Sequence, residues 1–136
     1  MSSFAARSGL CILLVLLLPL SVGCGSSSTL TAKSLNQQAD TVKSAAAEGA
    51  LLASDIARDR TTEPFARIHS GELAEQAKGA EQSLTKARAP AELESQRREA
   101  AAAARSTFAA LEDLHEAPTD HAVARRAERR LKALAR

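Results

Sequence analysis

The feature that most constrains this chain is a run of apolar residues whose spacing alternates between four and three from residue 35 to residue 56. This spacing puts one side chain per turn on a single helix face, so it predicts an α-helix that packs along a narrow seam. The seam positions are Leu35, Ala39, Val42, Ala46, Gly49, Ala53 and Ile56. Because more than half of them are Ala or Gly, a neighbouring helix is expected to approach closely.

Three later segments have the same kind of spacing, and prolines separate them. A second helix is expected over residues 63–87, a third from Pro90 to the turn at Pro118, and a shorter fourth after that turn. Thr31 or Ser34 can cap the first helix, and Thr119 or Asp120 the fourth. Phe65 and Ile68 open the second helix. The expected inner faces are Leu73, Ala77, Ala80, Leu84 and Ala87, then Leu93, Ala100, Ala104, Thr107 or Phe108, Leu111 and Leu114, and finally Val123, Ala127, Leu131 and Leu134.

Amphipathic helices joined by short loops favour antiparallel neighbours. The sequence therefore predicts an all-α fold, a small up-down-up-down bundle of four helices formed by residues 31–136. Three helices with a peripheral C-terminal helix are the alternative. No segment shows the strict alternation that a half-buried strand needs.

The composition limits what such a bundle can bind. Aromatic residues make up 2% of the chain, with three Phe and no Trp or Tyr, and alanine supplies most of the apolar content. A core of this kind closes helices on one another but leaves little room for a large apolar pocket. The net charge of +2 gives no reason to expect nucleic acid as a partner.

The N-terminal segment has the layout of an export signal. Arg7 precedes an apolar run over residues 10–18, Pro19 breaks the run, and Leu20-Ser21-Val22-Gly23-Cys24 follows. The run is shorter than the roughly 20 residues that span a bilayer as a helix. The last five residues resemble the lipobox of bacterial lipoprotein precursors, although Ser21 stands where Leu is commonest.

The resemblance implies cleavage between Gly23 and Cys24 and a diacylglycerol thioether on Cys24, with further acylation such as palmitate. Residues 1–23 would be a signal peptide, and residues 24–30 a lipidated N-terminus and a flexible tether rich in Gly and Ser. The protein would then be anchored in the cell membrane, facing the outside of the cytoplasm. An ordinary secretory signal with an incidental cysteine is the alternative.

The cysteines leave no redox chemistry under this interpretation. Cys11 leaves with the signal peptide and Cys24 carries the lipid, and these are the two cysteines of the chain. No disulfide and no cysteine-based metal site is then expected in the mature protein.

Candidate metal ligands gather around the turn at Pro118. Glu112 and His115 form a single Glu-x-x-His, which supplies half of a di-metal site in ferritin-like bundles. His121 follows the turn and can approach His115, but this spacing is no recognised zinc pattern. His69 lies four residues from both Phe65 and Leu73, as expected for a half-buried position.

No catalytic motif accompanies these residues. The sequence has no Gly-x-Ser-x-Gly, no phosphate-binding glycine loop and no His-Glu-x-x-His. We therefore expect no enzyme activity and no cofactor.

The charge distribution is most skewed at the C-terminus. From residue 120 to 136 six basic residues stand against Asp120 and Glu128, while residues 92–116 are predominantly acidic. Either the acidic third helix packs beside the basic fourth, or the fourth presents a basic surface to anionic lipid, cell-wall polymer or an envelope protein. Helical spacing places four cationic side chains on one outer face, namely Arg125, Arg126, Arg129 and Arg130.

Two functional hypotheses follow from these features. The first is a lipid-anchored structural or binding module of the cell envelope, which the alanine-rich core favours. The second is an anchored carrier or metal-binding protein for a small ligand.

Overall fold

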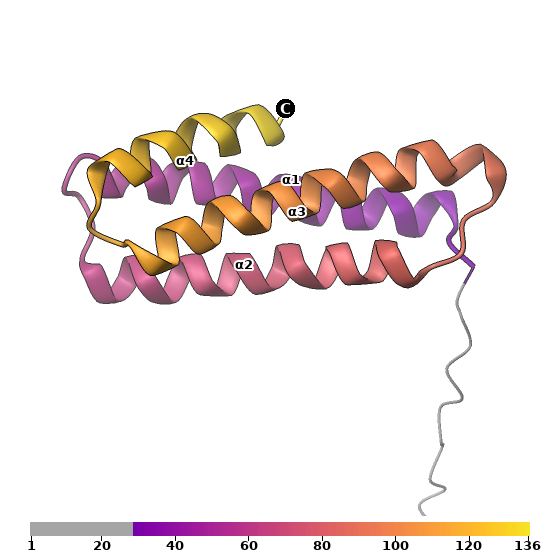
Figure 1. Ribbon diagram of the computed structural model, residues 1–136, viewed down its shortest axis with the longest axis horizontal. Helices are drawn as coiled ribbons and strands as arrows, with labels where there is room; N and C mark the ends of the chain where they lie inside the picture. Colours follow the sequence, from indigo (N-terminus) through magenta and orange to yellow (C-terminus); the bar gives the residue numbers. More distant parts are fainter. Residues whose placement is uncertain (1–28) are drawn as a thin grey trace, which may run out of the picture.

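The computed structural model describes residues 29–136, which form an antiparallel bundle of α-helices (Figure 1). The helices are α1 (Ala32–Ile56), α2 (Glu63–Lys86), α3 (Glu94–Glu116) and α4 (His121–Leu134), and a short 3-10 helix, η1 (Ala91–Leu93), precedes α3. Successive α-helices run in opposite directions, and the described residues contain no sheet. The all-α up-down-up-down bundle predicted from the sequence is confirmed.

Side-chain caps begin α1 and α4 at the expected places. The Thr31 hydroxyl accepts the backbone N–H of Ser34 at 3.1 Å, and the Ser34 hydroxyl accepts the N–H of Thr31 at 3.0 Å. At α4, one carboxylate oxygen of Asp120 accepts the N–H groups of Ala122 and Val123 at 2.7 and 3.0 Å. These bonds satisfy backbone donors that have no partner inside the helix.

The third α-helix begins later than the sequence suggested. Pro90 has an extended backbone and precedes the tight turn of η1, so α3 starts at Glu94 and Pro90 is not its first-turn proline. Arg97 links this start to the end of α2. Its guanidinium donates to the Leu84 carbonyl of α2 at 2.9 Å and to both carboxylate oxygens of Glu94, which fixes the first turn of α3 against the end of α2.

The buried residues confirm the predicted seam on α1 at every position except Ala39. All of its members are buried except Ala39, which is half-buried. On α2 the buried face is Ala66, Ser70, Leu73, Ala74, Ala77, Ala80 and Leu84. Phe65 and Ile68 lie outside this face and are 56% and 63% exposed, so the two large residues at the start of α2 do not belong to the core.

The core divides into three clusters along the bundle. The largest lies toward the α1–α2 loop and includes Leu73, Leu111, Leu114 and Leu131. A second, at the opposite end, contains Leu30, Leu35, Leu84 and Ala101, and a thin third cluster consists of Val42, Ala80 and Ala104. Alanine supplies many of the buried positions, as the composition suggested.

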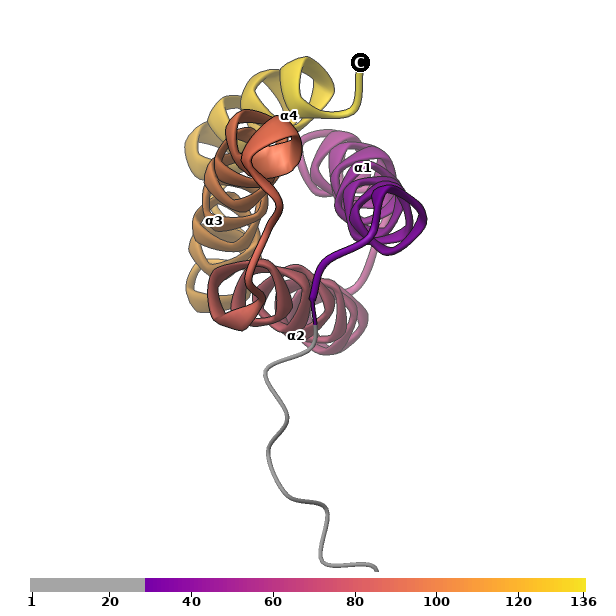
Figure 2. The same cartoon turned by 90° about the vertical axis from the view of Figure 1, so that its right-hand side faces the viewer.

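The fourth helix packs lengthwise on α1 and α3, on the side of the bundle away from α2 (Figures 1 and 2). With 14 residues it is shorter than α1, α2 and α3, and it begins at the end of the bundle that carries the α1–α2 loop. Its inner residues Ala124, Ala127 and Leu131 are buried, and Val123 and Leu134 are partly buried against the same cluster. A cross-section of the bundle therefore contains four helices along the length of α4 and three helices beyond its end.

The described chain enters the bundle earlier than expected. Leu30, which the sequence assigned to the tether, is 6% exposed, and its backbone N–H donates to the Arg88 carbonyl at 2.8 Å. It packs in one cluster with Leu35, as expected for a residue just before a helix cap that contacts the end of the first turn. Leu30 therefore belongs to the folded domain.

Candidate functional site

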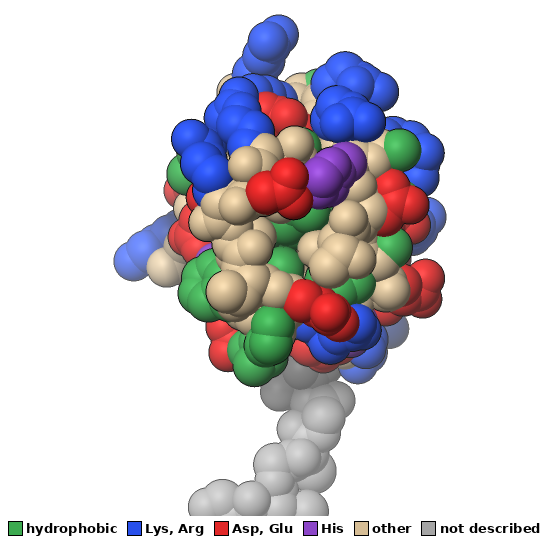
Figure 3. Space-filling model, turned by 90° about the vertical axis from the view of Figure 1, so that its left-hand side faces the viewer, with side chains coloured by type: hydrophobic (Ala, Val, Ile, Leu, Met, Phe, Trp, Pro, Cys, Tyr) green, Lys and Arg blue, Asp and Glu red, His purple; other side chains and the backbone are tan. Residues whose placement is uncertain are grey.

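The strongest candidate site is the outer face of α4. Arg125, Arg126, Arg129 and Arg130 are all exposed, whereas Ala127 and Leu131 on the same helix are buried. At 100° per residue, the four arginines occupy one sector of the helix opposite those buried residues. Lys and Arg side chains gather along the upper side of the molecule in Figure 3, where α4 lies.

The four guanidinium groups on this face have no acidic ion-pair partner among the described residues. Among the described residues, no carboxylate lies within 4 Å of any of them. The two acids of the segment are engaged elsewhere. Glu128 pairs with Lys132 at 2.7 Å, and Asp120 caps the helix. The result is a cationic surface whose charge is available to an external anion.

The neighbouring acidic helix does not neutralise this surface. Glu94 pairs with Arg97 and Arg98 of its own helix, and Arg105 of α3 pairs with Glu81 of α2 at 2.8 Å. None of the ion pairs among residues 29–136 joins α3 to α4. The charge complementarity between these helices that the sequence suggested is therefore not formed as direct pairs.

Hydrogen bonds hold the two acids of α4 in their charged form. The backbone N–H groups of Val123 and Ala122 lower the pKa of Asp120, and Arg126 and His121 contribute as nearby charges. The ammonium group of Lys132 lowers the pKa of Glu128 by hydrogen bonding, with further contributions from Arg58 and Ser54. Each carboxylate thus supports α4 without facing its outer side.

Close packing fixes the direction in which this face points. Leu131 of α4 is fully buried, and one of its methyl groups lies near Gly49 of α1. His121 is held from the other side, because its Nε2 lies 2.9 Å from a carboxylate oxygen of Asp59 in the α1–α2 loop. The backbone at Asp59 has a positive φ of 54°, which Asp tolerates better than most residues.

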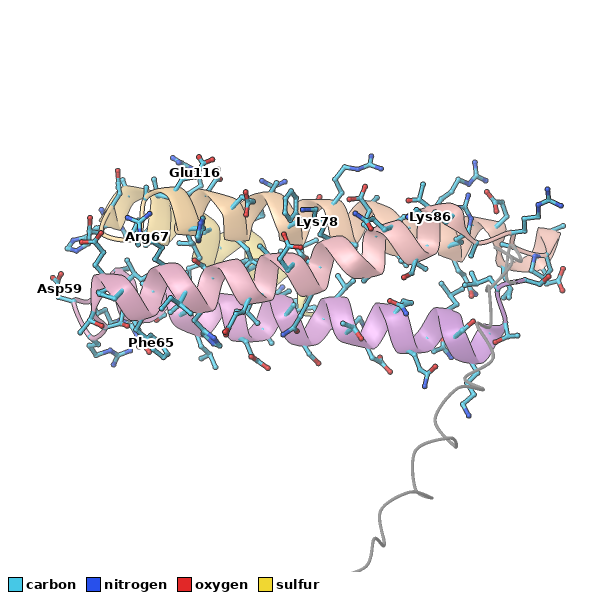
Figure 4. All side chains as sticks on the ribbon, turned by 90° about the horizontal axis from the view of Figure 1, so that it is seen from below. Asp59, Phe65, Arg67, Lys78, Lys86 and Glu116 are labelled. Carbon is cyan, nitrogen blue, oxygen red and sulfur yellow. The ribbon has the colours of Figure 1, made fainter. Side chains whose placement is uncertain are left out.

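The candidate metal ligands do not come together. The Nδ1 atom of His115 lies 2.8 Å from the Arg67 carbonyl of α2, so this nitrogen donates there, while His121 bonds to Asp59. Arg67 in turn donates to the His115 carbonyl at 3.2 Å. In Figure 4, Arg67 points from α2 toward the end of α3 near Glu116. This reciprocal pair joins α2 to α3.

No group of three or more His, Cys, Asp or Glu side chains within residues 29–136 is placed to hold a metal ion. Glu112 therefore has no second ligand set to complete a di-metal site within these residues.

His69 is half-buried, as expected, and its ring lies 5.3 Å from that of Phe65. Phe65 itself points to the opposite side of α2 from Arg67 (Figure 4).

A groove of about 470 Å³ lies between α1 and α3 where α4 ends. Its apolar lining includes Leu35, Val42 and Leu134, and Lys43, Glu99 and Arg136 supply charged groups. Leu35 and Val42 are 3% and 2% exposed, so other side chains already cover most of its apolar floor. The partly exposed residues Ala39, Ala100, Ala103 and Leu134 also belong to its apolar lining.

Sequence reasoning missed Leu30 and Arg97, which lie at the end of the bundle where the described chain begins. The pattern Leu30-Thr31-x-x-Ser34-Leu35 is the signal for the first, since a residue before the cap often packs on the fourth residue of the helix. No local signal identifies Arg97, because its partner Leu84 lies 13 residues away.

The predicted signal peptide, the lipidation site Cys24 and residues 25–28 lie outside the described residues. Within residues 29–136, no helix is both long enough and apolar enough to cross a bilayer. No family model, curated protein or solved structure matches this chain.

Proposed function

We propose that this chain is a lipid-anchored module of the bacterial cell envelope that binds an anionic component of the envelope through the outer face of α4. One observation carries the binding half of the proposal. Four arginines share an exposed face and have no carboxylate partner among the described residues. Guanidinium groups donate paired hydrogen bonds to phosphate and carboxylate groups, so such a face suits an anionic partner.

The anchoring half rests on the resemblance of residues 20–24 to a lipobox. A lipid on Cys24 would hold α4 at a high local concentration near the envelope, so contacts that are individually weak become useful. A compact alanine-rich bundle suits this role, because it presents a rigid surface without needing a pocket.

The binding test compares the wild-type chain with a variant in which all four arginines are changed to Gln. Both are reconstituted in zwitterionic vesicles and mixed with isolated cell walls, first at low and then at high salt. We expect the wild type to bind at low salt and to be released by high salt, because salt screens such contacts. Loss of four contacts of about 0.5 kcal/mol each should weaken binding at least about tenfold.

A matched control removes the same charge from the other end of the bundle. It carries Gln at four exposed basic positions outside α4, namely Lys33, Lys86, Arg88 and Arg98. This variant should bind as well as the wild type. Equal binding by the α4 variant, or equal weakening by the control, would show that α4 does not bind the partner or that only net charge matters.

The anchoring test compares the full precursor with a Cys24→Ser variant. The wild type should lose residues 1–23, gain the mass of acyl chains and partition into detergent. The variant should stay unprocessed or become soluble, because no thiol remains to accept the lipid. Identical masses and partitioning would contradict the lipoprotein assignment. A stoichiometric metal or a co-purifying apolar ligand in these mass spectra would instead favour the carrier.

A further inference from the structure

The folded domain fixes the point at which the tether leaves it. The backbone N–H of Leu30 bonds to the carbonyl of Arg88, which follows α2, and Thr29 is paired with the same residue. The Leu30 side chain is buried beside Leu35 and Leu84. The chain toward Cys24 therefore starts at the level of α2, at the end of the bundle that carries the α2–α3 connection (Figure 2).

The basic face lies on the opposite side of the molecule. Since α4 packs on α1 and α3, these two helices separate it from α2 (Figures 1 and 2). Helices pack with their axes 8–10 Å apart, and a helix with side chains is about 10 Å thick. A flat surface that touches the outer side of α4 is thus about 20 Å from the level of α2.

The average span of the tether is shorter than that distance. Five residue steps separate Cys24 from Thr29. A fully extended chain gains at most about 3.5 Å per step, or about 17 Å in total. A flexible Gly- and Ser-rich segment of this length spans only about 13 Å on average. A bilayer lying flat against the arginines would therefore need a tether at full extension, whereas a tether of average span places the bilayer away from them.

The chemistry of the face also argues against a membrane or a protein surface. Helices that lie on membranes insert large apolar residues, and protein interfaces rely on buried aromatic or aliphatic anchors. The large exposed apolar residues of the described chain are Leu51, Phe65 and Ile68, and none of them is on α4. A flexible polymer with repeated anionic groups needs no such anchor.

We infer that α4 is a docking face for a linear anionic polymer of the cell wall, turned away from the membrane that holds the anchor. This inference rests on the proposed function and specifies its partner. The domain then connects the membrane to the wall. Its lipid end binds the bilayer, and the arginines on the far side bind phosphate or carboxylate groups along the polymer.

The test uses the mature lipidated chain in two kinds of vesicle, pure phosphatidylcholine and phosphatidylcholine with phosphatidylglycerol. The probe is fluorescent poly(glycerol phosphate) at physiological salt. A second variant carries about 20 additional Gly and Ser residues after Gly25, which lengthens the average tether span to about 28 Å and lets α4 reach the bilayer. The four-arginine variant is the binding control.

The wild type should bind the polymer equally well, within about twofold, on both kinds of vesicle. With α4 turned away from the bilayer, the thickness of the bundle, about 20 Å, separates its outer face from the anionic lipid, which is more than the Debye length of about 8 Å. The lengthened variant should bind it on phosphatidylcholine but about tenfold more weakly on anionic vesicles, where lipid head groups compete for the arginines.

Two results would overturn the inference while leaving an anionic partner in place. One is a wild type that loses the polymer on anionic vesicles as strongly as the lengthened variant. The other is a lengthened variant that keeps the polymer there. Failure of the proposed function itself would give a different result. The wild type would then bind the polymer on neither kind of vesicle, or it would bind no better than the four-arginine variant.

Discussion

At Gly49, α1 lies close to a leucine of α3 and a leucine of α4. A Cβ atom at this position would lie 2.5 Å from Cδ2 of Leu111 and 3.1 Å from Cδ1 of Leu131. Both leucines are fully buried, so their side chains would have to shift within the core. Gly79 offers the opposite case, since a Cβ atom there would meet nothing within 4 Å.

Substitution by alanine should lower the free energy of unfolding at Gly49 and raise it at Gly79. Gly49→Ala should lower the free energy of unfolding by up to about 2 kcal/mol, because overpacking of a core costs about 1–3 kcal/mol and the gain in helix propensity returns about 1 kcal/mol. Gly79→Ala should raise it by about 0.5–1 kcal/mol. Urea unfolding of both variants tests this pair, and a stabilised Gly49→Ala would mean that Leu111 and Leu131 shift away from α1 without loss of packing.

Single residues also show how far the sequence can be interpreted. The spacing from Leu35 to Ile56 identified the seam of α1, because burial on a helix follows its period. Phe65 and Ile68 open α2 as expected, but spacing alone did not show that they are exposed, since large apolar residues in an exposed sector look the same in sequence as core residues. Only the direction in which α2 meets its neighbours decides between the two, and that depends on contacts across the bundle.

At the scale of an element, α4 depends on its cap. Hydrogen bonds from Val123 and Ala122 hold the pKa of Asp120 below its ordinary value of 3.8. A lowered folded pKa means that the carboxylate stabilises α4 above about pH 4, and that this contribution is lost as the pH falls through the folded value. Glu94 and Glu128, whose pKa values are also lowered by hydrogen-bonded cations, add to the same acid dependence.

Asp120→Asn should therefore weaken the acid dependence of stability without removing the cap, because Asn also accepts backbone N–H groups. Melting temperatures from neutral pH down to about pH 2 should fall less steeply for the variant than for the wild type. Asp120→Ala, which removes the cap, should be less stable at neutral pH than either. Parallel curves for wild type and Asp120→Asn would show that the Asp120 carboxylate does not titrate differently on folding.

Helix starts divide into those that the sequence predicts and one that it does not. Thr31 and Asp120 are each one of the two cap residues that the sequence offered at these starts, because a cap is a local pattern of side chain and backbone. The contact of Arg97 at the start of α3 with the Leu84 carbonyl was missed, since it joins residues that are 13 positions apart in the chain. The basic face of α4 was predicted by spacing, but its direction relative to the tether depends on Leu30, Arg88 and the packing of three helices.

At the scale of the whole molecule, the two ends of the bundle are unequally supported. The cluster under α4 contains Leu73, Leu111, Leu114 and Leu131, and four helices surround it. The cluster at the tether end has Leu30, Leu35 and Leu84 as its large members, and Val42 is the largest residue of the thin cluster between them. Because burial of apolar area is the main stabilising contribution, the tether end should open more easily.

Hydrogen exchange of backbone amides should follow this gradient. Amides at the start of α1, the end of α2 and the start of α3 should exchange faster than those beside Leu111 and Leu131, because local opening there exposes less apolar area. Leu30→Ala removes a nearly buried side chain at a cost of about 2 kcal/mol, so it should speed exchange at the tether end and leave the α4 end nearly unchanged. Equal acceleration at both ends would mean that the bundle opens as one unit, in which case pulling on the tether would disturb the arginine face as well.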